Sequence, residues 1–365
     1  MPHFERVLTL MIERNASDLH LKVNCPPVCR INGELITFPE FGNYTGEDLQ
    51  RIAYAIMSPK QKELFQATSE LDFAYSVPDL GRFRTNIFLQ RGTFGIIMRL
   101  VKTQIPTFQT LHLPPMLTGI AEAKSGIIAV SGPTGCGKSS TLAAIVDYIN
   151  SREKVHIMAV EDPIEYLHAD KMGIVNQREV GIDTESFKNA LKYIMRQDPD
   201  VILIGEMRDS ETLMAAMMAA EIGHLVLTTL HTVSASSSVL RMLDFFPSDM
   251  RDQVRAQLAS VLNAVVCQRL IQTDSGKGVV PAVEIMVCTG MVRKLMYENK
   301  FDKLSAAIEL GKEFGMQTFN QSLLQLVQAG TISTETALAN SLHPESLKLN
   351  LQGIYLDDSR RILDT

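Results

Sequence analysis

The sequence has 365 residues, of which 45% are hydrophobic and 21% are charged, and its net charge is −6. A chain of this length is expected to form two domains with ordinary globular cores. The acidic balance argues against a protein that binds nucleic acid through a basic face. No apolar run reaches the length of a membrane-spanning helix, and the N-terminus lacks a signal-peptide segment, so we expect a cytoplasmic protein.

The first hundred residues carry the pattern of a small α+β domain. Apolar residues at helical spacing predict a helix from Phe4 to about Asn15. Asn32-Gly33 predicts a hairpin turn. Capping signals predict helices over 45–57 and 58–67. The predicted strands cover residues 18–22, 28–31, 34–37, 71–77, 83–89 and 94–101.

Residues 1–101 therefore form the first expected domain, residues 102–110 a linker broken by Pro106, and residues 111–365 a second domain. Strands and helices alternate in the second domain, which is the pattern of a parallel sheet with helices on its faces. Its predicted strands are 127–131, 155–160, 201–204, 225–229, 266–270 and 279–286. Its predicted helices are 141–146, 210–222, 236–245, 248–263 and, in a helical C-terminal tail, 305–310, 317–328, 333–339 and 344–351.

One motif stands out in the second domain, because Gly132 to Ser139 fits G-x-x-x-x-G-K-[ST] between a predicted strand and a predicted helix. The glycines let backbone N–H groups turn inward around phosphate oxygens, and the helix N-terminus adds partial positive charge. Lys138 is expected to reach the β- and γ-phosphates, and Ser139 to ligate Mg²⁺. The expected nucleotide-binding residues are Gly132, Pro133, Thr134, Gly135, Cys136, Gly137, Lys138, Ser139 and Ser140.

Acidic clusters follow two buried strands of the same predicted sheet, one beginning at Glu161 and the other containing Glu206. In parallel sheets such residues lie at the edge where the phosphate loop also lies. Hydrolysis of ATP needs a carboxylate to orient water and a second group to hold Mg²⁺. His231 follows another predicted strand at this edge, where we expect it to hydrogen-bond the γ-phosphate or a carboxylate and so to report bound ATP. A histidine that only caps the end of the strand is the alternative.

Arginines recur on two predicted strands of the first domain. Alternate residues of a strand share a face, so Arg82 and Arg84 point the same way, and Arg99 is expected to join them across a hairpin. If that face meets the nucleotide of a neighbouring subunit, these residues are arginine fingers and the protein forms a ring. Surface arginines that only aid solubility are the alternative.

Together these segments resemble the ATPases of the type II secretion and type IV pilus superfamily, and most closely the pilus-retraction (PilT/PilU-like) branch. The resemblance covers nearly the whole chain. It is carried by 16–20, 30–34, 81–86, 113–115, the Walker A motif at 132–139, the acidic box at 161–166, 177–181, 196–200, the Walker B segment at 204–209 and the His box at 224–232.

This resemblance implies a PAS-like N-terminal domain, a RecA-like P-loop ATPase domain and a homohexameric ring. It also implies work on the pilus platform protein at the inner membrane, with the ATPase bound peripherally on the cytoplasmic side. Glu161 is then the expected catalytic base, and Glu206 supports Mg²⁺ and its water. The sequence leaves open whether these two roles are exchanged.

One segment departs from the branch that it resembles. Retraction ATPases typically read Ala-Ile-Arg-Asn-Leu-Ile-Arg-Glu where this chain has Met291-Val-Arg-Lys-Leu-Met-Tyr-Glu298. Because that element is tied to retraction, an accessory pilus ATPase that works with a paralogue is the alternative function. A nucleic-acid translocase and a nucleotide-bound scaffold without turnover are further alternatives, and we expect no nucleic-acid partner.

Overall fold

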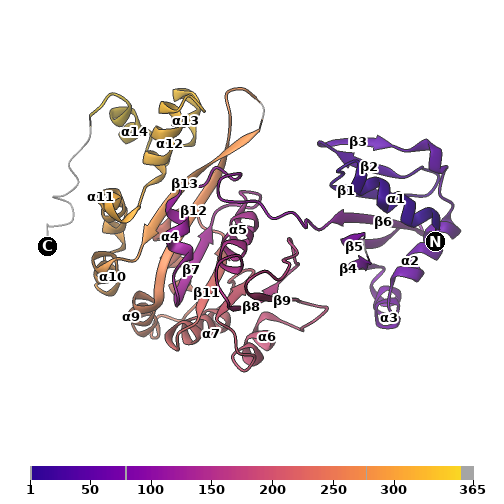
Figure 1. Cartoon of the computed structure of the whole chain (residues 1–365), viewed down its shortest axis with the longest axis horizontal. Helices are drawn as coiled ribbons and strands as arrows, with labels where there is room; N and C mark the ends of the chain where they lie inside the picture. The colour runs from indigo at the N-terminus through magenta and orange to yellow at the C-terminus, as the bar shows by residue number, and fades with distance from the viewer. Residues whose placement is uncertain (1, 79, 277, 355–365) are drawn as a thin grey trace. The chain divides into compact units, whose positions relative to one another are not determined.

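The structure is a computed structural model that describes residues 2–78, 80–276 and 278–354 (Figure 1). The chain divides into two compact units. Unit 1 comprises Met1–Thr103 with Pro163–Leu167, and unit 2 comprises Gln104–Asp162 with His168–Thr365. The short return of 163–167 to unit 1 was not expected from the sequence. It includes a bridge between Lys102 and Tyr166.

Unit 1 is built on a six-stranded antiparallel sheet in the order β3-β2-β1-β6-β5-β4. Its strands are β1 (Asp18–Leu21), β2 (Val28–Ile31), β3 (Glu34–Thr37), β4 (Glu70–Val77), β5 (Gly81–Gln90) and β6 (Thr93–Leu100). Its α-helices are α1 (Pro2–Glu13), α2 (Gly46–Ile56) and α3 (Pro59–Thr68), and the short 3₁₀ helix η1 covers Pro39–Phe41. The core gathers Leu8, Met11, Leu49, Phe83 and Met98 between the sheet and its helices.

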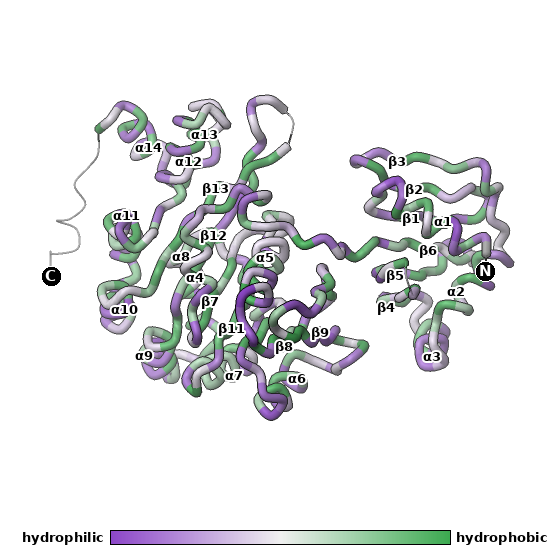
Figure 2. The backbone as a smooth tube through the Cα atoms, viewed as in Figure 1, coloured by the Kyte–Doolittle hydropathy of each residue, from purple (hydrophilic) through white to green (hydrophobic). Residues whose placement is uncertain are grey.

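The turn and the helix caps that the sequence predicts in unit 1 are formed in the structure. Asn32 and Gly33 both adopt positive φ, as the turn between β2 and β3 requires. Thr45 and Ser58 each accept a hydrogen bond from the backbone three residues on, completing the capping boxes of α2 and α3. Figure 2 shows α3 as largely hydrophilic, which agrees with its one buried residue, Phe65.

Unit 2 contains a seven-stranded sheet in the order β13-β12-β7-β11-β10-β8-β9. The strands from β12 to β9 run parallel, and β13 pairs with β12 in the antiparallel sense. Its strands are β7 (Gly126–Ser131), β8 (His156–Glu161), β9 (Ile174–Glu179), β10 (Val201–Ile204), β11 (Leu225–Leu230), β12 (Leu262–Gln272) and β13 (Val279–Val287). The α/β fold class is thereby confirmed.

Both faces of this sheet are covered because its strands are apolar on both sides. Ile127 and Ala129 of β7 pack into a core shared with α6 to α9, whereas Ile128 and Val130 pack into a core shared with α4 and α5. Such continuous apolar runs are typical of strands buried between two helical layers. The covering helices are α4 (Met116–Ala121), α5 (Lys138–Asn150), α6 (Phe187–Ile194), α7 (Ser210–Glu221), α8 (Ala235–Asp244) and α9 (Arg251–Val261).

The C-terminal part of unit 2 is helical, as predicted. Its helices are α10 (Gly290–Tyr297), α11 (Leu304–Leu310), α12 (Phe319–Gln328), α13 (Thr334–Asn340) and α14 (Pro344–Leu351), with 3₁₀ turns at Phe301–Lys303 and Gly311–Phe314. Among residues 2–354, with 79 and 277 set aside, no helix is both long and apolar enough to span a bilayer.

Several elements of the fold were not predicted, and several boundaries were misplaced. The edge strand β9 and the helices α4, α6 and α10 had no predicted counterpart. The helix predicted to run to Asn263 ends at Val261, because β12 already begins at Leu262 and not at residue 266. The contacts within the chain place the division between the two units after Thr103. The domain limits at 101 and 111 stay a prediction.

Candidate nucleotide site

The loop from Gly132 to Ser139 connects β7 to α5 in unit 2. Gly135 and Gly137 adopt φ values of +79° and +91°, which L-residues with a Cβ rarely adopt. At Gly132 a Cβ would lie 2.3 Å from the backbone oxygen of Gln268. The loop can therefore keep this path only with glycine at these positions, and Gly137 serves as the N-cap of α5.

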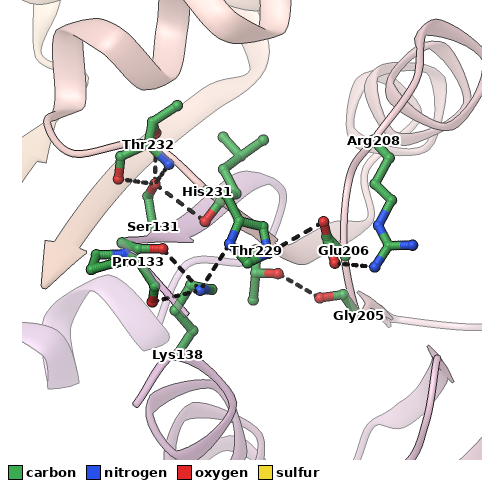
Figure 3. Close-up of polar contacts among 11 residues, drawn as sticks. Ser131, Pro133, Lys138, Gly205, Glu206, Arg208, Thr229, His231 and Thr232 are labelled. Atoms are coloured by element: carbon green, nitrogen blue, oxygen red, sulfur yellow. Dashed lines mark hydrogen bonds and ion pairs between the residues drawn. The ribbon is translucent and has the colours of Figure 1, made fainter. Parts of the chain in front are cut away.

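Lys138 is the first residue of α5, and its side chain folds back over the loop. Its Nζ donates to the carbonyl oxygens of Gly132 at 2.9 Å and Pro133 at 3.1 Å (Figure 3). Only 8% of the residue is exposed, and burial lowers its pKa while the charge of Glu206 opposes that shift. The ammonium group is thus held at the loop by backbone oxygens.

The imidazole of His231 lies between Lys138 and Glu206. Its Nδ1 is 3.5 Å from Lys138 Nζ, and its Nε2 is 3.3 Å from Glu206 Oε1. An ammonium group can only donate and a carboxylate can only accept. A neutral imidazole with its proton on Nε2 satisfies both contacts, so the geometry assigns that tautomer.

Glu206 is held from its other side by Arg208. Arg208 Nη2 donates to Glu206 Oε2 at 2.6 Å, and this bond lowers the pKa of Glu206, with a smaller contribution from His231. Burial opposes the shift but does not reverse it. Glu206 is therefore a carboxylate that carries its negative charge at neutral pH.

The strand order explains why these residues meet. Four strands of the sheet lie side by side in the order β7, β11, β10 and β8. At their carboxyl ends, β7 leads into the loop of Lys138, β11 into His231 and β10 into the segment with Glu206, and β8 ends at Glu161. Thr229 of β11 donates to the carbonyl of Gly205 at 2.6 Å, which joins the ends of β11 and β10. Parallel strands bring their carboxyl ends to one edge, and ligands bind there in sheets of this kind.

Glu161 is at the end of β8, next to the strand that precedes Glu206. A Cβ on Gly205 would lie 3.1 Å from the Cα of Glu161, so the two strand ends approach closely. Glu161 Oε1 accepts a hydrogen bond from Nε2 of Gln177 on β9 at 2.9 Å. The structure brings Glu161 to the same edge as Glu206 but on the side away from Lys138.

The three candidate finger arginines all lie in unit 1. Arg84 on β5 is directly opposite Arg99 on β6, and both side chains are exposed, whereas Arg82 is half-buried. Arg99 Nε donates to Asp18 Oδ1 of β1 at 2.8 Å. Burial raises the pKa of Asp18, but the bonds from Ser17 and Arg99 outweigh it and lower the pKa overall. Arg99 therefore has a structural partner inside its own unit.

The remaining loop residues predicted to bind nucleotide lie around Lys138. Pro133, Thr134, Gly135 and Ser139 are exposed, Gly137 and Ser140 are half-buried, and Gly132 and Cys136 are buried. The exposure of Ser139 at the first turn of α5 leaves its hydroxyl accessible to a cation. The roles of these residues, like those of the carboxylates and arginines, stay predictions.

The contacts of three polar residues that support the site were not predicted, although Gln177 and Thr232 lie in segments that carry the family resemblance. Gln177 binds Glu161, and Gln268 of β12 binds the phosphate loop. Thr232 binds Ser131 through both its backbone N–H, at 3.0 Å, and its hydroxyl, at 2.6 Å. Ser131 and Gln268 occupy apolar-looking strands, and the only available signal was a polar residue inside a hydrophobic run.

The residues fit a nucleotide and a divalent cation. Three loop glycines adopt positive φ, and the buried ammonium group of Lys138 lies against the loop backbone. The exposed Ser139 and the ionised carboxylate of Glu206 lie at the same edge of the sheet. These are the groups that phosphate and Mg²⁺ require. The fold and the site define a P-loop ATPase.

Comparisons with known proteins agree with this class. The family model described as "Type II/IV secretion system protein" matches residues 96–334, and this chain belongs to that family. It is 40% identical to the type IV pilus retraction ATPase PilT of Pseudomonas aeruginosa, over 93% of this chain and 98% of that protein. It is 39% identical to the type IV pilus ATPase PilU of the same organism, over 96% and 91% of the two chains.

A solved structure agrees as well. The crystal structure of the pilus retraction motor PilT with bound ADP superposes with a TM-score of 0.88 and 41% identity, covering 94% of this chain and 98% of that one. The predicted resemblance to this superfamily, and the assignment as a nucleotide-binding ATPase, are confirmed.

Proposed function

We propose that this chain hydrolyses ATP to power the retraction of type IV pili. The observation that carries the proposal is the row of Lys138, His231, Glu206 and Glu161 along one edge of the unit 2 sheet. Relatives whose names include pilus retraction are similar to this chain over nearly their whole length.

Each residue of the row has a part in the proposed reaction. ATP, when bound with Mg²⁺, supplies the phosphoryl group and the charge that the metal neutralises. Lys138 would hold the phosphates, and Ser139 with Glu206 would hold the cation. Glu161 orients or deprotonates the attacking water, although Glu206, ionised and next to His231, is the other candidate for this role. His231 contacts both Lys138 and Glu206, so its position responds to what Lys138 binds.

The assembly and the place of action are further parts of the proposal. The protein works as a homohexamer, in which Arg82, Arg84 and Arg99 of one subunit approach the nucleotide of the next. The exposure of Arg84 and Arg99 on opposing strands supports this role, because such side chains can reach a neighbour. Its partner is the pilus platform protein, reached from the cytoplasmic side of the inner membrane. The proposal also includes paralogous pilus ATPases as partners.

One observation favours a second function, that of an accessory ATPase. Five positions of this segment differ from the retraction branch, and three of them, Met291, Lys294 and Tyr297, are exposed and spaced three residues apart on α10, so they share one face of the helix. The unchanged Arg293 instead donates to the carbonyls of Ala259 and Ser260 at the end of α9. The exposed face of α10 therefore differs from that of retraction ATPases, and an exposed face is one that a partner would contact.

A deletion of the gene, complemented by wild-type or variant protein, tests these alternatives. A retraction motor predicts that cells without the gene keep their pili but lose twitching, and that the Lys138→Ala variant does not restore it. A triple variant, Met291→Ala with Lys294→Asn and Tyr297→Arg, restores the residues usual in retraction ATPases at the three exposed positions. If deletion leaves twitching intact until a paralogue is also impaired, the accessory function holds.

A further inference from the structure

Gln268 of β12 is a polar residue in the interior of unit 2, with 2% of its surface exposed. Its carboxamide makes two hydrogen bonds, both to the segment around the phosphate loop. Nε2 donates to the carbonyl oxygen of Cys136 at 2.7 Å, and Oε1 accepts from the hydroxyl of Thr141 at 2.9 Å. Its partners are also buried, with exposed fractions of 3% for Cys136 and 1% for Thr141.

The two bonds fix the orientation of the carboxamide. The carbonyl of Cys136 can only accept, so it requires the NH₂ group, and the hydroxyl of Thr141 is then left to donate to the oxygen. A flipped amide would set two acceptors against each other inside the protein. Losing the side chain would leave the Cys136 carbonyl buried without this donor, which is costly.

The bond to Cys136 also sets the direction of the next N–H group. A trans peptide is planar, and its C=O and N–H point in opposite directions. Because the carbonyl of Cys136 points toward Gln268 of β12, the N–H of Gly137 points away from β12. The φ of +91° at Gly137 permits this orientation.

Gln268 meets the loop at its beginning as well as at its end. A Cβ added to Gly132 would lie 2.3 Å from the backbone oxygen of Gln268, which is too close for any side chain. A Cβ added to Gly137 would lie 3.1 Å from Nε2 of Gln268. β12 runs parallel to β7, with Cys267 opposite Ser131, so Gln268 follows the level at which the loop leaves the sheet. The residue packs against both glycines that bound the loop.

We propose that Gln268 is a positioning residue for the nucleotide, which holds the peptide between Cys136 and Gly137 with its N–H turned toward the phosphates. It acts through the loop and does not touch the nucleotide. The inference rests on the nucleotide binding in the proposed function, and it adds a residue outside the motifs that carry the family resemblance.

The first test compares Gln268→Met with Thr141→Val. Methionine keeps the approximate volume but removes both hydrogen bonds, whereas the Thr141 variant keeps the bond to Cys136. Titration with a fluorescent ADP analogue is expected to give about a tenfold higher Kd for Gln268→Met, equivalent to about 1.4 kcal/mol, and less than about a threefold change for Thr141→Val. Wild-type affinity in Gln268→Met, or an equal loss in both variants, would overturn the proposal.

The second test uses Gln268→Glu and pH. An ionised glutamate cannot donate to Cys136, but a protonated one donates from its hydroxyl and accepts from Thr141, restoring both bonds. Burial raises the pKa of a carboxyl group, so the glutamate at this position is expected to take up its proton at a higher pH than an exposed glutamate does. The Kd of this variant should approach that of wild type as the pH falls, while the ratio of Gln268→Met to wild type stays constant. A purely structural role does not predict this recovery.

A third measurement separates failure of this inference from failure of the proposed function. If wild-type protein does not bind the ADP analogue, the proposed function fails. Hydrogen exchange of the peptide covering residues 132–142 in the protein without nucleotide still tests Gln268. Exchange should be faster in Gln268→Met than in Thr141→Val, and equal rates would contradict the inference.

Discussion

His231 and Glu206 are joined by a 3.3 Å contact between Nε2 and Oε1, although they follow different strands of the sheet, β11 and β10. The other ring nitrogen of His231 faces Lys138 at 3.5 Å. A ligand that draws Lys138 away from the carbonyls of Gly132 and Pro133 therefore alters one of the two contacts of the ring. This coupling of phosphate loop and carboxylate underlies the first predictions.

Lys138→Ala is expected to abolish measurable ATP hydrolysis and to weaken nucleotide binding, because the variant loses the ammonium group that meets the phosphates. A loss of at least about a hundredfold in kcat/KM is expected. Lys124→Ala is the matched control, since that lysine is exposed and pairs with Glu153 at the surface. Phosphate release measured over a range of ATP concentrations, including ones well below KM, checks the result, and a kcat/KM near that of wild type would contradict the proposed site.

Glu206→Gln should retain nucleotide binding but lose most of its turnover. The amide keeps the shape and can still accept from Arg208, but it lacks the charge that a cation or a water requires. We expect kcat to fall about a hundredfold or more, with a Kd for ADP within about threefold of wild type. Glu211→Gln, on the exposed part of α7, is the control. Should Glu161→Gln alone stop turnover, Glu161 would be the base and Glu206 a ligand only.

His231→Ala is expected to lower kcat by about ten- to a hundredfold while leaving affinity for ADP nearly unchanged. The variant removes the ring that contacts both Lys138 and Glu206. His224→Ala changes a histidine just before β11, at the opposite end of that strand, and should leave kcat unchanged. Equal effects from both variants would indicate a general loss of stability, which thermal unfolding would reveal.

Arg99→Ala should reduce ATP hydrolysis without a matching loss of nucleotide binding, as expected for a group that acts on the transition state from a neighbouring subunit. It also removes the bond to Asp18, whose pKa should then rise toward or above its ordinary value. Arg51→Ala, at an exposed pair on α2, is the control. Mixing Arg99→Ala with Lys138→Ala subunits and recovering activity would demonstrate action in trans, and no recovery would argue against it.

His168 should make unit 2 less stable in mild acid. Burial lowers its pKa from 6.5 to about 4, so the folded state stays neutral while the unfolded state takes up a proton. The stability from this group is complete above pH 6.5 and is lost as the pH falls toward 4. Between pH 7 and about pH 5 the loss is about 2 kcal/mol. Urea unfolding of wild type and of His168→Gln at both values tests this, and an unchanged pH dependence in the variant would refute it.

Local signals predicted most of the fold. The Asn32-Gly33 turn, the Thr45 and Ser58 caps and the apolar strands of unit 2 each depend on a few neighbouring residues, so they can be identified from a short window. The strand β9 was missed because it lies at the sheet edge and has only two apolar residues, Ile174 and Val175, followed by four polar residues up to Glu179. The position of β9 beside β8 depends on contacts between residues that are far apart in the sequence.

The residues of the site that belong to a sequence motif could be predicted. The residues that reach the site through contacts between segments far apart in the sequence could not. Lys138, Glu206 and His231 were expected at one sheet edge, and they are found there in contact. The positions of Gln177 against Glu161, and of Gln268 against Cys136, are set by strand pairing between segments far apart in the sequence. No local pattern reports such a pairing.

The sheet order has a consequence for how the molecule is made. β11 lies between β7 and β10, although it leaves the ribosome after both of them. A nascent chain that has not yet reached Leu225 thus has a gap in the middle of its sheet, and His231 has not yet been synthesised. Translation must pass this strand before the chain can retain a nucleotide, so truncated products should be recognisable as open, protease-sensitive chains.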